Sequence, residues 1–333
     1  MVLLKFCRTK DVKRETVLPK GYPQIVNSRI IIISREAEFK ICFFPLQPEF
    51  PCCLRCRKLI NIYMNLKSFF IIILVFFCYS ATSQTLSICS WNLKDFGQTK
   101  TDKQIDFIAH TLRNYDIIAI QEVVAGPGGP KAVAKLIDAL NRSGAKWDYT
   151  ISHGTSSDRY SKERYAFLWK TSKTSLVGEA WLEKKYNLQL SREPYLGRFL
   201  LGKKQVTVVT FHAIPKAKQP ETEIKFLQLL PPEYPKDVLI FCGDFNLSEA
   251  HSVFNPLKKL GYPAAMSGQK TSLRQKCIKG DCLASEYDNF FYQQARVNCD
   301  NTGILPFYTS FPDIKEARKI SDHVPVYLRF SLN

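Results

Sequence analysis

Short runs of apolar residues alternate with amphipathic segments along residues 86–330 of this 333-residue chain. The apolar runs predict buried strands, and apolar residues at helical spacing predict helices. The expected strands cover residues 86–91, 116–120, 165–169, 206–211, 238–242 and 324–330. The expected helices cover 102–112, capped by Asp102, and 132–140 and 220–230, with a tight loop at 126–130. This alternation predicts one α/β domain over residues 84–333.

Polar residues stand where several of these strands end. Asn92 follows the first strand, Glu122 the second and His212 a later one. Gly243-Asp244-Phe245-Asn246 follows the strand at 238–242, and Ser321-Asp322-His323 precedes the last strand. Each feature alone also fits a structural role, because Gly-Asp is ordinary turn chemistry and a lone histidine is more often structural. Since α/β proteins build sites at strand ends, their recurrence indicates one site.

Two histidines and two acids in this set fit the hydrolysis of a phosphodiester. Attack by water on phosphorus needs a base, an acid for the departing oxygen, and positive charge beside the phosphoryl oxygens. His212 and His323 can serve as base and acid near neutral pH if a carboxylate orients each ring. Glu163 and Asp288, each beside an aromatic strand residue, are the candidate orienting acids.

The oxygen-bearing side chains of the set favour a hard divalent cation. Carboxylate and amide oxygens suit Mg²⁺ or Ca²⁺ rather than zinc. The expected cofactor is therefore Mg²⁺, with Ca²⁺ and Mn²⁺ as alternatives. The candidate ligands are Asn92, Glu122, Asp244 and Asp322.

The order of these motifs resembles the endonuclease/exonuclease/phosphatase superfamily, and within it the deoxyribonuclease I-like enzymes. Each motif is a weak signal by itself, whereas the ordered set over residues 86–330 is specific. The motifs are Trp91-Asn92-Leu93, Gln121-Glu122-Val123, Lys162-Glu163-Arg164-Tyr165, Ser191-Arg192-Glu193-Pro194, Phe211-His212-Ala213, Gly243-Asp244-Phe245-Asn246, Tyr287-Asp288 and Ile320-Ser321-Asp322-His323-Val324-Pro325-Val326.

The resemblance implies an α/β fold of two packed mixed β-sheets flanked by helices, a four-layer sandwich. It also implies that Glu163 orients His212 and that Asp288 orients His323, the two histidines sharing the acid and base roles. Asp244 is then a further catalytic residue beside the metal and the histidines.

The metal and phosphate contacts are likewise implied by the resemblance. Glu122 would hold the catalytic ion with help from Asn92, Asp244 and Asp322. Asn246, also in the catalytic set, and Arg192 would hold the scissile and neighbouring phosphates, since arginine suits bidentate phosphate contact.

The sequence departs from the deoxyribonuclease I pattern where that pattern has an arginine and a tyrosine in the DNA minor groove. Val124 and Ser161 stand at these two positions. The disulfide of the pattern is also missing, because Glu249 and Ser285 occupy its places. The resemblance therefore supports the catalytic residues more strongly than it supports binding in the DNA minor groove.

The segment before the domain has the layout of a secretory signal peptide. A cationic start at Met64, an apolar stretch at 69–78 and a small-residue site at 81–83 predict cleavage before Gln84. The apolar stretch is too short for a bilayer, although a retained anchor is the alternative. Residues 1–63 are then an unstructured, mis-called extension. The competing hypothesis is a cytoplasmic domain with Cys52, Cys53 and Cys56 as metal ligands.

Charge and cysteine content fit an exported protein with a polyanionic partner. The net charge is +17, and removal of residues 1–83 leaves 34 basic and 25 acidic residues, a net charge of +9. We expect a disulfide between Cys277 and Cys282 and buried thiols at Cys89 and Cys242.

These features predict an exported, divalent-metal-dependent endonuclease that cleaves DNA and leaves 5′-phosphates. We expect nucleic acid as the substrate, a monomer, and no stable membrane association after processing. The main alternative is a phosphoesterase of the same superfamily that acts on a phospholipid or a soluble phosphate ester. A silent binding module and an intracellular repair enzyme for abasic sites fit less well, because the catalytic set is complete and a signal peptide is present.

Overall fold

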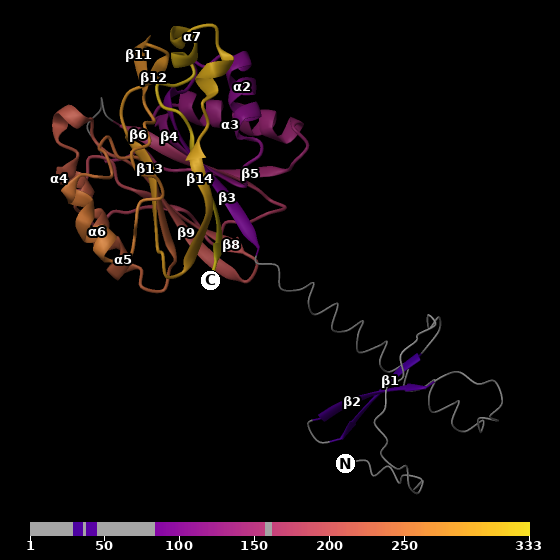
Figure 1. The fold of residues 1–333 in the computed structure, drawn as a ribbon. Helices are drawn as coiled ribbons and strands as arrows, with labels where there is room; N and C mark the ends of the chain where they lie inside the picture. Colours follow the sequence, from indigo (N-terminus) through magenta and orange to yellow (C-terminus); the bar gives the residue numbers. More distant parts are fainter. Residues whose placement is uncertain (1–28, 36–37, 45–83, 157–161) are drawn as a thin grey trace, which may run out of the picture. The chain divides into compact units, whose positions relative to one another are not determined.

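The computed structural model describes residues 29–35, 38–44, 84–156 and 162–333 (Figure 1). The chain divides into two compact units, Met1–Ala81 and Thr82–Asn333. The expected signal peptide at 64–83, the candidate ligands Cys52, Cys53 and Cys56, and Ser161 lie outside the described residues. Among the described helices, none is long and apolar enough to cross a membrane.

The described residues of the first unit form an antiparallel hairpin of β1 (Arg29–Arg35) and β2 (Glu38–Phe44). Both strands lie within residues 1–63, for which the sequence predicts no regular structure. Four consecutive isoleucines, residues 30–33, have the high strand propensity of β-branched side chains.

The second unit is built on two mixed β-sheets. The six-stranded sheet has the order β14-β15-β3-β4-β6-β5, and the five-stranded sheet has the order β13-β10-β9-β8-β7. The pairs β3/β4 and β9/β10 are parallel and all other pairs in the two sheets are antiparallel. The strands are β3 (Thr85–Phe96), β4 (Ile117–Val124), β5 (Trp147–Ile151), β6 (Glu163–Lys170), β7 (Trp181–Leu182), β8 (Tyr195–Leu201), β9 (Lys204–His212), β10 (Leu239–Asp244), β13 (Asp288–Tyr292), β14 (Val297–Ile304) and β15 (Val326–Leu332).

Helices cover the outer face of each sheet, so the unit has four layers (Figure 1). One apolar core between the sheets includes Ile88, Phe167, Val208 and Ile240. A second core lies under α2 and α3 on the six-stranded sheet, and a third lies under α4 to α6 on the five-stranded sheet. The predicted two-sheet α/β sandwich is confirmed. The helices are α2 (Asp102–Leu112), α3 (Gly128–Arg142), η1 (Lys216–Lys218), α4 (Glu221–Ile224), η2 (Leu227–Leu229), α5 (Leu230–Glu233), η3 (Ser252–Phe254), α6 (Asn255–Lys259), η4 (Phe307–Ser310) and α7 (Ile314–Arg318).

Two helix starts differ from the prediction. The cap of α2 is Thr101 rather than Asp102, because the Thr101 hydroxyl and the Gln104 side chain form a reciprocal capping box. The helix α3 begins inside the predicted loop 126–130, at Gly128. Pro130 is tolerated there because amides of the first helical turn have no partner within the helix.

The single helix predicted at 220–230 is wrong, since the segment consists of the short turns α4, η2 and α5. Pro231 and Pro232 lack the amide hydrogens that would continue the helical ladder. The last strand begins at Val326 instead of residue 324, because Pro325 has no amide hydrogen and the amide of Val324 donates to the Thr271 carbonyl.

The cysteine predictions for the second unit are confirmed. Cys277 and Cys282 form a disulfide, which joins β11 (Leu273–Ile278) to β12 (Asp281–Leu283) in a two-stranded hairpin. Cys89 and Cys242 are buried free thiols, and burial raises the pKa of Cys242 to about 12.

Candidate active site

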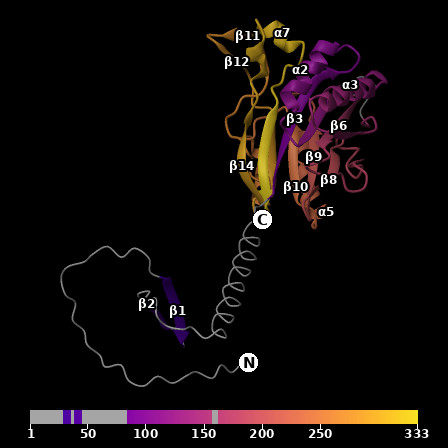
Figure 2. The same ribbon diagram turned by 90° about the vertical axis from the view of Figure 1, so that its right-hand side faces the viewer.

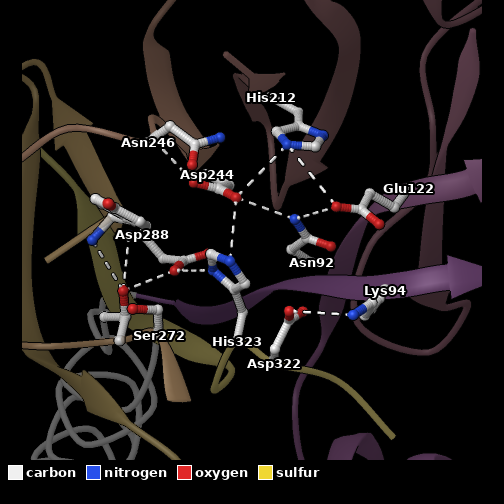
Figure 3. A network of polar contacts seen from close by, with 12 residues as sticks. Asn92, Lys94, Glu122, His212, Asp244, Asn246, Ser272, Asp288, Asp322 and His323 are labelled. Carbon is white, nitrogen blue, oxygen red and sulfur yellow. Dashed lines mark hydrogen bonds and ion pairs between the residues drawn. The ribbon is translucent and has the colours of Figure 1, made fainter. Parts of the chain in front are cut away.

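Five strands of the two facing sheets bring the predicted polar residues to one place. In the five-stranded sheet, Asp244 on β10 is the register partner of both His212 on β9 and Asp288 on β13. Asn92 on β3 and Glu122 on β4 lie on the six-stranded sheet. A hydrogen bond of 3.0 Å from Asn92 Nδ2 to Asp244 Oδ2 joins the two sheets. Figure 3 shows these side chains pointing toward one another.

Glu163 holds the ring of His212. Both carboxylate oxygens of Glu163 lie 3.0 Å from His212 Nδ1, and both residues are buried. Burial alone would lower the pKa of His212, but the charge of Glu163 outweighs it, so the pKa is raised. The Nε2 atom is left facing Asp244.

Asp288 holds the ring of His323 in the same way. Asp288 Oδ2 lies 2.7 Å from His323 Nδ1 and accepts a second hydrogen bond of 2.6 Å from the hydroxyl of Thr271. Burial would lower the pKa of His323, but the charges of Asp288 and Asp244 raise it well above its ordinary value. The two orienting pairs expected from the resemblance are thus present as contacts.

Asp244 lies between the two imidazoles (Figure 3). Its Oδ2 atom is 3.6 Å from His212 Nε2 and 3.5 Å from His323 Nε2. Burial would raise the pKa of Asp244, but the charges of His323 and His212 outweigh it, and the pKa is lowered. One buried carboxylate therefore faces the free nitrogen of both rings.

Backbone geometry explains why glycine and asparagine stand at their positions in the Gly243-Asp244-Phe245-Asn246 motif. Gly243 has φ 134°, and a Cβ at this position would lie 1.9 Å from the carbonyl oxygen of Phe211. Asn246 has φ 50°, a left-handed conformation that asparagine tolerates better than most residues. Its amide donates to Asp244 Oδ1 at 2.8 Å, which fixes the carboxylate that faces the histidines.

Asn92 and Glu122 leave oxygen atoms suited to a cation. Asn92 Nδ2 donates to Glu122 Oε1 at 2.9 Å, and the amide of Asp95 donates to Glu122 Oε2 at 3.1 Å. Among the described residues, the buried Asn92 Oδ1 has no hydrogen-bond donor. An orphaned amide oxygen beside a carboxylate fits a hard divalent ion.

The structure does not bring Asp322 into this group as a free ligand. Its carboxylate pairs with Lys94 Nζ at 3.4 Å (Figure 3). It also pairs with Arg318 Nη2 at 3.2 Å. A different group of potential ligand atoms, on Asp244, Asp288 and His323, lies within 4.8 Å. In that group Asp288 and His323 are already hydrogen-bonded to each other.

Arg192 is buried and lies against Glu163. Its Nε atom is 3.3 Å from Glu163 Oε2, and its Nη1 atom donates to the Ala213 carbonyl at 3.1 Å. Asn246 Nδ2 donates to the same carbonyl at 3.0 Å. The two residues expected to hold phosphates therefore share one backbone partner beside the histidines.

A pocket of about 340 Å³ opens over this group. A larger depression of about 760 Å³ lies elsewhere, along β5 and β7, and contains none of the catalytic candidates. The smaller pocket therefore opens beside His212, one of the two candidate catalytic histidines. It is lined by Asp95, Glu122, Val124, Lys162, Glu163, Arg192 and His212.

Three supporting residues were not predicted from the sequence. Thr271 binds Asp288, the indole of Trp91 donates to the His323 carbonyl at 2.7 Å, and the hydroxyl of Ser321 donates to the Asn92 carbonyl at 2.5 Å. Ser321 stands within a motif that the sequence singles out, whereas Thr271 has no local signal. Gln121 is buried and binds Ser90 and Thr210 between the sheets, so it has a structural role.

Comparisons with known proteins identify the family of this chain. The model of the Endonuclease/Exonuclease/phosphatase family matches residues 89–323. A deoxyribonuclease of Thioalkalivibrio sp. (strain K90mix) is 27% identical over 285 residues, covering 79% of this chain and 76% of the relative. Deoxyribonuclease-1 of Bos taurus is 30% identical over 175 residues, covering 49% of this chain and 61% of the relative. Deoxyribonuclease gamma of Homo sapiens is 30% identical over 183 residues, covering 48% and 56%.

Solved structures share the fold at low sequence identity. An endonuclease/exonuclease/phosphatase family protein of Bacteroides thetaiotaomicron superposes with a TM-score of 0.56 at 16% identity, covering 76% of this chain and 96% of its own. The human Nocturnin catalytic domain has a TM-score of 0.55 at 16% identity, covering 75% and 94%. The family match over residues 89–323 shows that this chain belongs to the endonuclease/exonuclease/phosphatase family.

Proposed function

We propose that this chain is an exported, divalent-metal-dependent endonuclease that hydrolyses DNA phosphodiester bonds. The observation that carries the proposal is the position of Asp244 Oδ2, 3.6 Å and 3.5 Å from the free nitrogens of two carboxylate-oriented histidines. Three relatives named as deoxyribonucleases and the net charge of +9 that remains without residues 1–83 support DNA as the substrate.

The chemistry needs two proton transfers at one phosphorus atom. One imidazole takes a proton from the attacking water as the new P–O bond forms. The other gives a proton to the 3′ oxygen of the sugar as the old P–O bond breaks, so the phosphate stays attached to the 5′ oxygen. Nδ1 of each ring is held by Glu163 or Asp288, so Nε2 is the atom that exchanges the proton.

The remaining polar groups of the site would bind the divalent ion and the phosphate. Asn92 and Glu122 are the residues that would hold the divalent ion, which when bound stabilises negative charge on the phosphoryl oxygens. Arg192 and Asn246 lie on the other side of His212 and would bind the phosphate. Burial of the histidines and of Asp244 strengthens these electrostatic contacts because the local dielectric is low.

Export is the second half of the proposal. It rests on the signal-peptide pattern at 64–83 and on a disulfide that needs an oxidising compartment. Processing at this site leaves the domain at 84–333 as a soluble monomer. N-terminal sequencing of the native protein tests it, with Gln84 expected as the first residue. A mature chain that begins near Met1 would contradict it.

A direct experiment tests the activity. Purified protein is incubated with plasmid DNA, RNA, phospholipid vesicles or a soluble phosphate ester, each with Mg²⁺ and with a chelator. We expect nicking of the plasmid with Mg²⁺ only, and no nicking by a His323→Ala variant. Release of phosphate from the lipid or the soluble ester, without nicking of DNA, would instead support a phosphoesterase of the same family.

A further inference from the structure

The hairpin β11–β12 extends directly from the active site. The amide of Leu273 donates to the Asp322 carbonyl at 2.7 Å, and Ser272 pairs with His323 as an isolated bridge. Thr271, which precedes the hairpin, binds the carboxylate that orients His323. Figure 2 shows the hairpin projecting at the α7 end of the domain. Its base is therefore tied to the segment that carries Asp322 and His323.

The tip of this hairpin is fixed. The Cys277–Cys282 disulfide links the strands across a sequence separation of five, and Ile278 pairs with Asp281 beside it. Lys279 and Gly280 form the connecting turn with φ 49° and 83°. Positive φ at both central residues is the signature of a type I′ turn, which suits the twist of a hairpin.

Lysine is an unusual residue at the first position of such a turn. Asparagine, aspartate or glycine is favoured there, because the Cβ atom of an L-residue disfavours the left-handed conformation. Glycine has no Cβ, and the short polar side chains of asparagine and aspartate can hydrogen-bond locally. Lys279 therefore adopts a strained conformation that an asparagine in its place would not share to the same degree. A strained residue at an exposed tip points to a use for its side chain.

The hairpin carries an excess of positive charge. Residues 270–283 contain four basic residues and one acidic residue. The acid, Asp281, is paired with Lys270 at 2.9 Å and with Arg274 at 3.4 Å. Lys276 and Lys279 are exposed, and within the described part of the chain neither has an acidic partner. Two cations at the tip are thus available for a polyanion.

We propose that the tip of the β11–β12 hairpin binds the phosphate backbone of duplex DNA beside the cleaved bond, through Lys276 and Lys279. This inference rests on the proposed nuclease function. The six residues of β11 place the tip roughly 17 Å from the base of the hairpin, about five base pairs along a duplex. The hairpin supplies positive charge at a site whose pocket is lined in part by Val124, an uncharged residue.

Equilibrium binding tests the proposal without cleavage. A fluorescein-labelled duplex of about 20 base pairs is titrated with protein in EDTA at several salt concentrations, and anisotropy is recorded. For the Lys276→Asn/Lys279→Asn variant we expect about tenfold weaker binding. The slope of log K against log salt should fall by about 1.8, because each lost phosphate contact contributes about 0.9.

A matched control removes one charge from the opposite end of a strand that enters the site. Lys203 is exposed in the turn before β9, and His212 lies at the other end of that strand. Lys203→Asn should leave affinity and salt slope unchanged. Lys279→Asn by itself should preserve or raise the melting temperature, since asparagine suits the turn, which separates lost binding from lost folding.

The outcomes separate this inference from the nuclease proposal. Affinity and salt slope equal to those of Lys203→Asn would overturn the hairpin site, even if the wild-type protein nicks plasmid DNA. Binding of the double variant to phosphatidylserine vesicles is measured in parallel. Loss of vesicle binding with DNA binding intact would assign the tip to a membrane surface and would also overturn the inference. Absence of Mg²⁺-dependent nicking would overturn the nuclease function alone.

Discussion

The ammonium group of Lys100 lies 2.7 Å from the carbonyl oxygen of Ile320, immediately before the segment that carries Asp322 and His323. The same Nζ atom donates to the Lys319 carbonyl at 3.0 Å. Lys100 is 9% exposed, and burial lowers its pKa. A buried cation on the loop after β3 therefore fixes the backbone that leads to one catalytic candidate.

Replacing Lys100 by methionine tests this positioning role. Methionine keeps most of the side-chain volume but removes both hydrogen bonds to the carbonyls, which are then left buried and unpaired. We expect kcat to fall about tenfold or more, because a small displacement of His323 misaligns proton transfer, with KM nearly unchanged. Plasmid nicking rates measure both constants.

The matched control for that variant is Lys103→Met, which changes an exposed lysine on α2. Both variants are compared by thermal unfolding as well as by rate. A variant of Lys100 that loses stability but keeps the wild-type kcat would show that this lysine only stabilises the fold.

The two histidines should carry the chemical step. His212→Ala or His323→Ala each removes one Nε2 atom facing Asp244, and we expect kcat to fall by about 10² or more. His110→Ala, at an exposed position of α2, is the control and should retain full activity. Near-normal turnover in either site variant would remove that histidine from the mechanism.

The site and the fold were predictable to different extents. Asn92, Glu122, His212 and Asp244 were found because each closely follows a buried apolar run, and such a change from apolar to polar residues is visible in the sequence. His212 and Asp244 are the last residues of β9 and β10, whereas β3 and β4 continue beyond Asn92 and Glu122. The short turns at 221–233 were missed because their apolar spacing is helical, although Pro231 and Pro232 interrupt the ladder.

The supporting contacts could not be predicted from the sequence, because they join distant segments. Lys100 and Ile320 are 220 residues apart, and Thr271 and Asp288 meet only after the β11–β12 hairpin folds back. Asp322 was expected to offer its carboxylate to the metal. Instead, the carboxylate is paired with Lys94 from β3 and with Arg318 from α7. Local patterns contain no information on such partners.

Metal binding should depend on Glu122 far more than on Asp322. For Glu122→Gln we expect the Mg²⁺ concentration for half-maximal nicking to rise tenfold or more, because a charged ligand is lost. Asp322→Asn breaks its ion pairs with Lys94 and Arg318, each worth about 1 kcal/mol or less, and should leave this concentration nearly unchanged. Equal shifts in both variants would place Asp322 at the metal after all.

Arg192→Ala should affect both binding and turnover. The sequence led us to expect a phosphate contact, whose loss lowers the salt slope of DNA binding by about 1. The ion pair of Arg192 with Glu163 adds a second effect, because the carboxylate that orients His212 loses a buried partner, so kcat should fall as well. Anisotropy titrations and nicking rates separate the two. An unchanged salt slope would argue against the phosphate contact.

Acid stability should depend on Glu193, which neighbours the phosphate-binding candidate Arg192. Burial would raise the pKa of Glu193, but the Lys184 ammonium and the hydroxyl and amide of Ser156 hydrogen-bond to the carboxylate and lower the pKa. A lowered pKa in the folded state means that Glu193 stabilises the protein above the pKa of the unfolded chain, near 4.3. That contribution is lost as the pH falls through the folded-state pKa.

Glu193→Gln should therefore destabilise the protein by about 1–3 kcal/mol at pH 7, and the difference from wild type should shrink as the pH falls below about 4. Chemical denaturation at a series of pH values measures it. Glu179→Gln, at an exposed position, is the control and should leave the free energy of unfolding at pH 7 within about 0.5 kcal/mol of wild type. A Glu193→Gln deficit that stays constant down to pH 3 would show that the lost contacts, and not the carboxylate charge, stabilise this corner of the site.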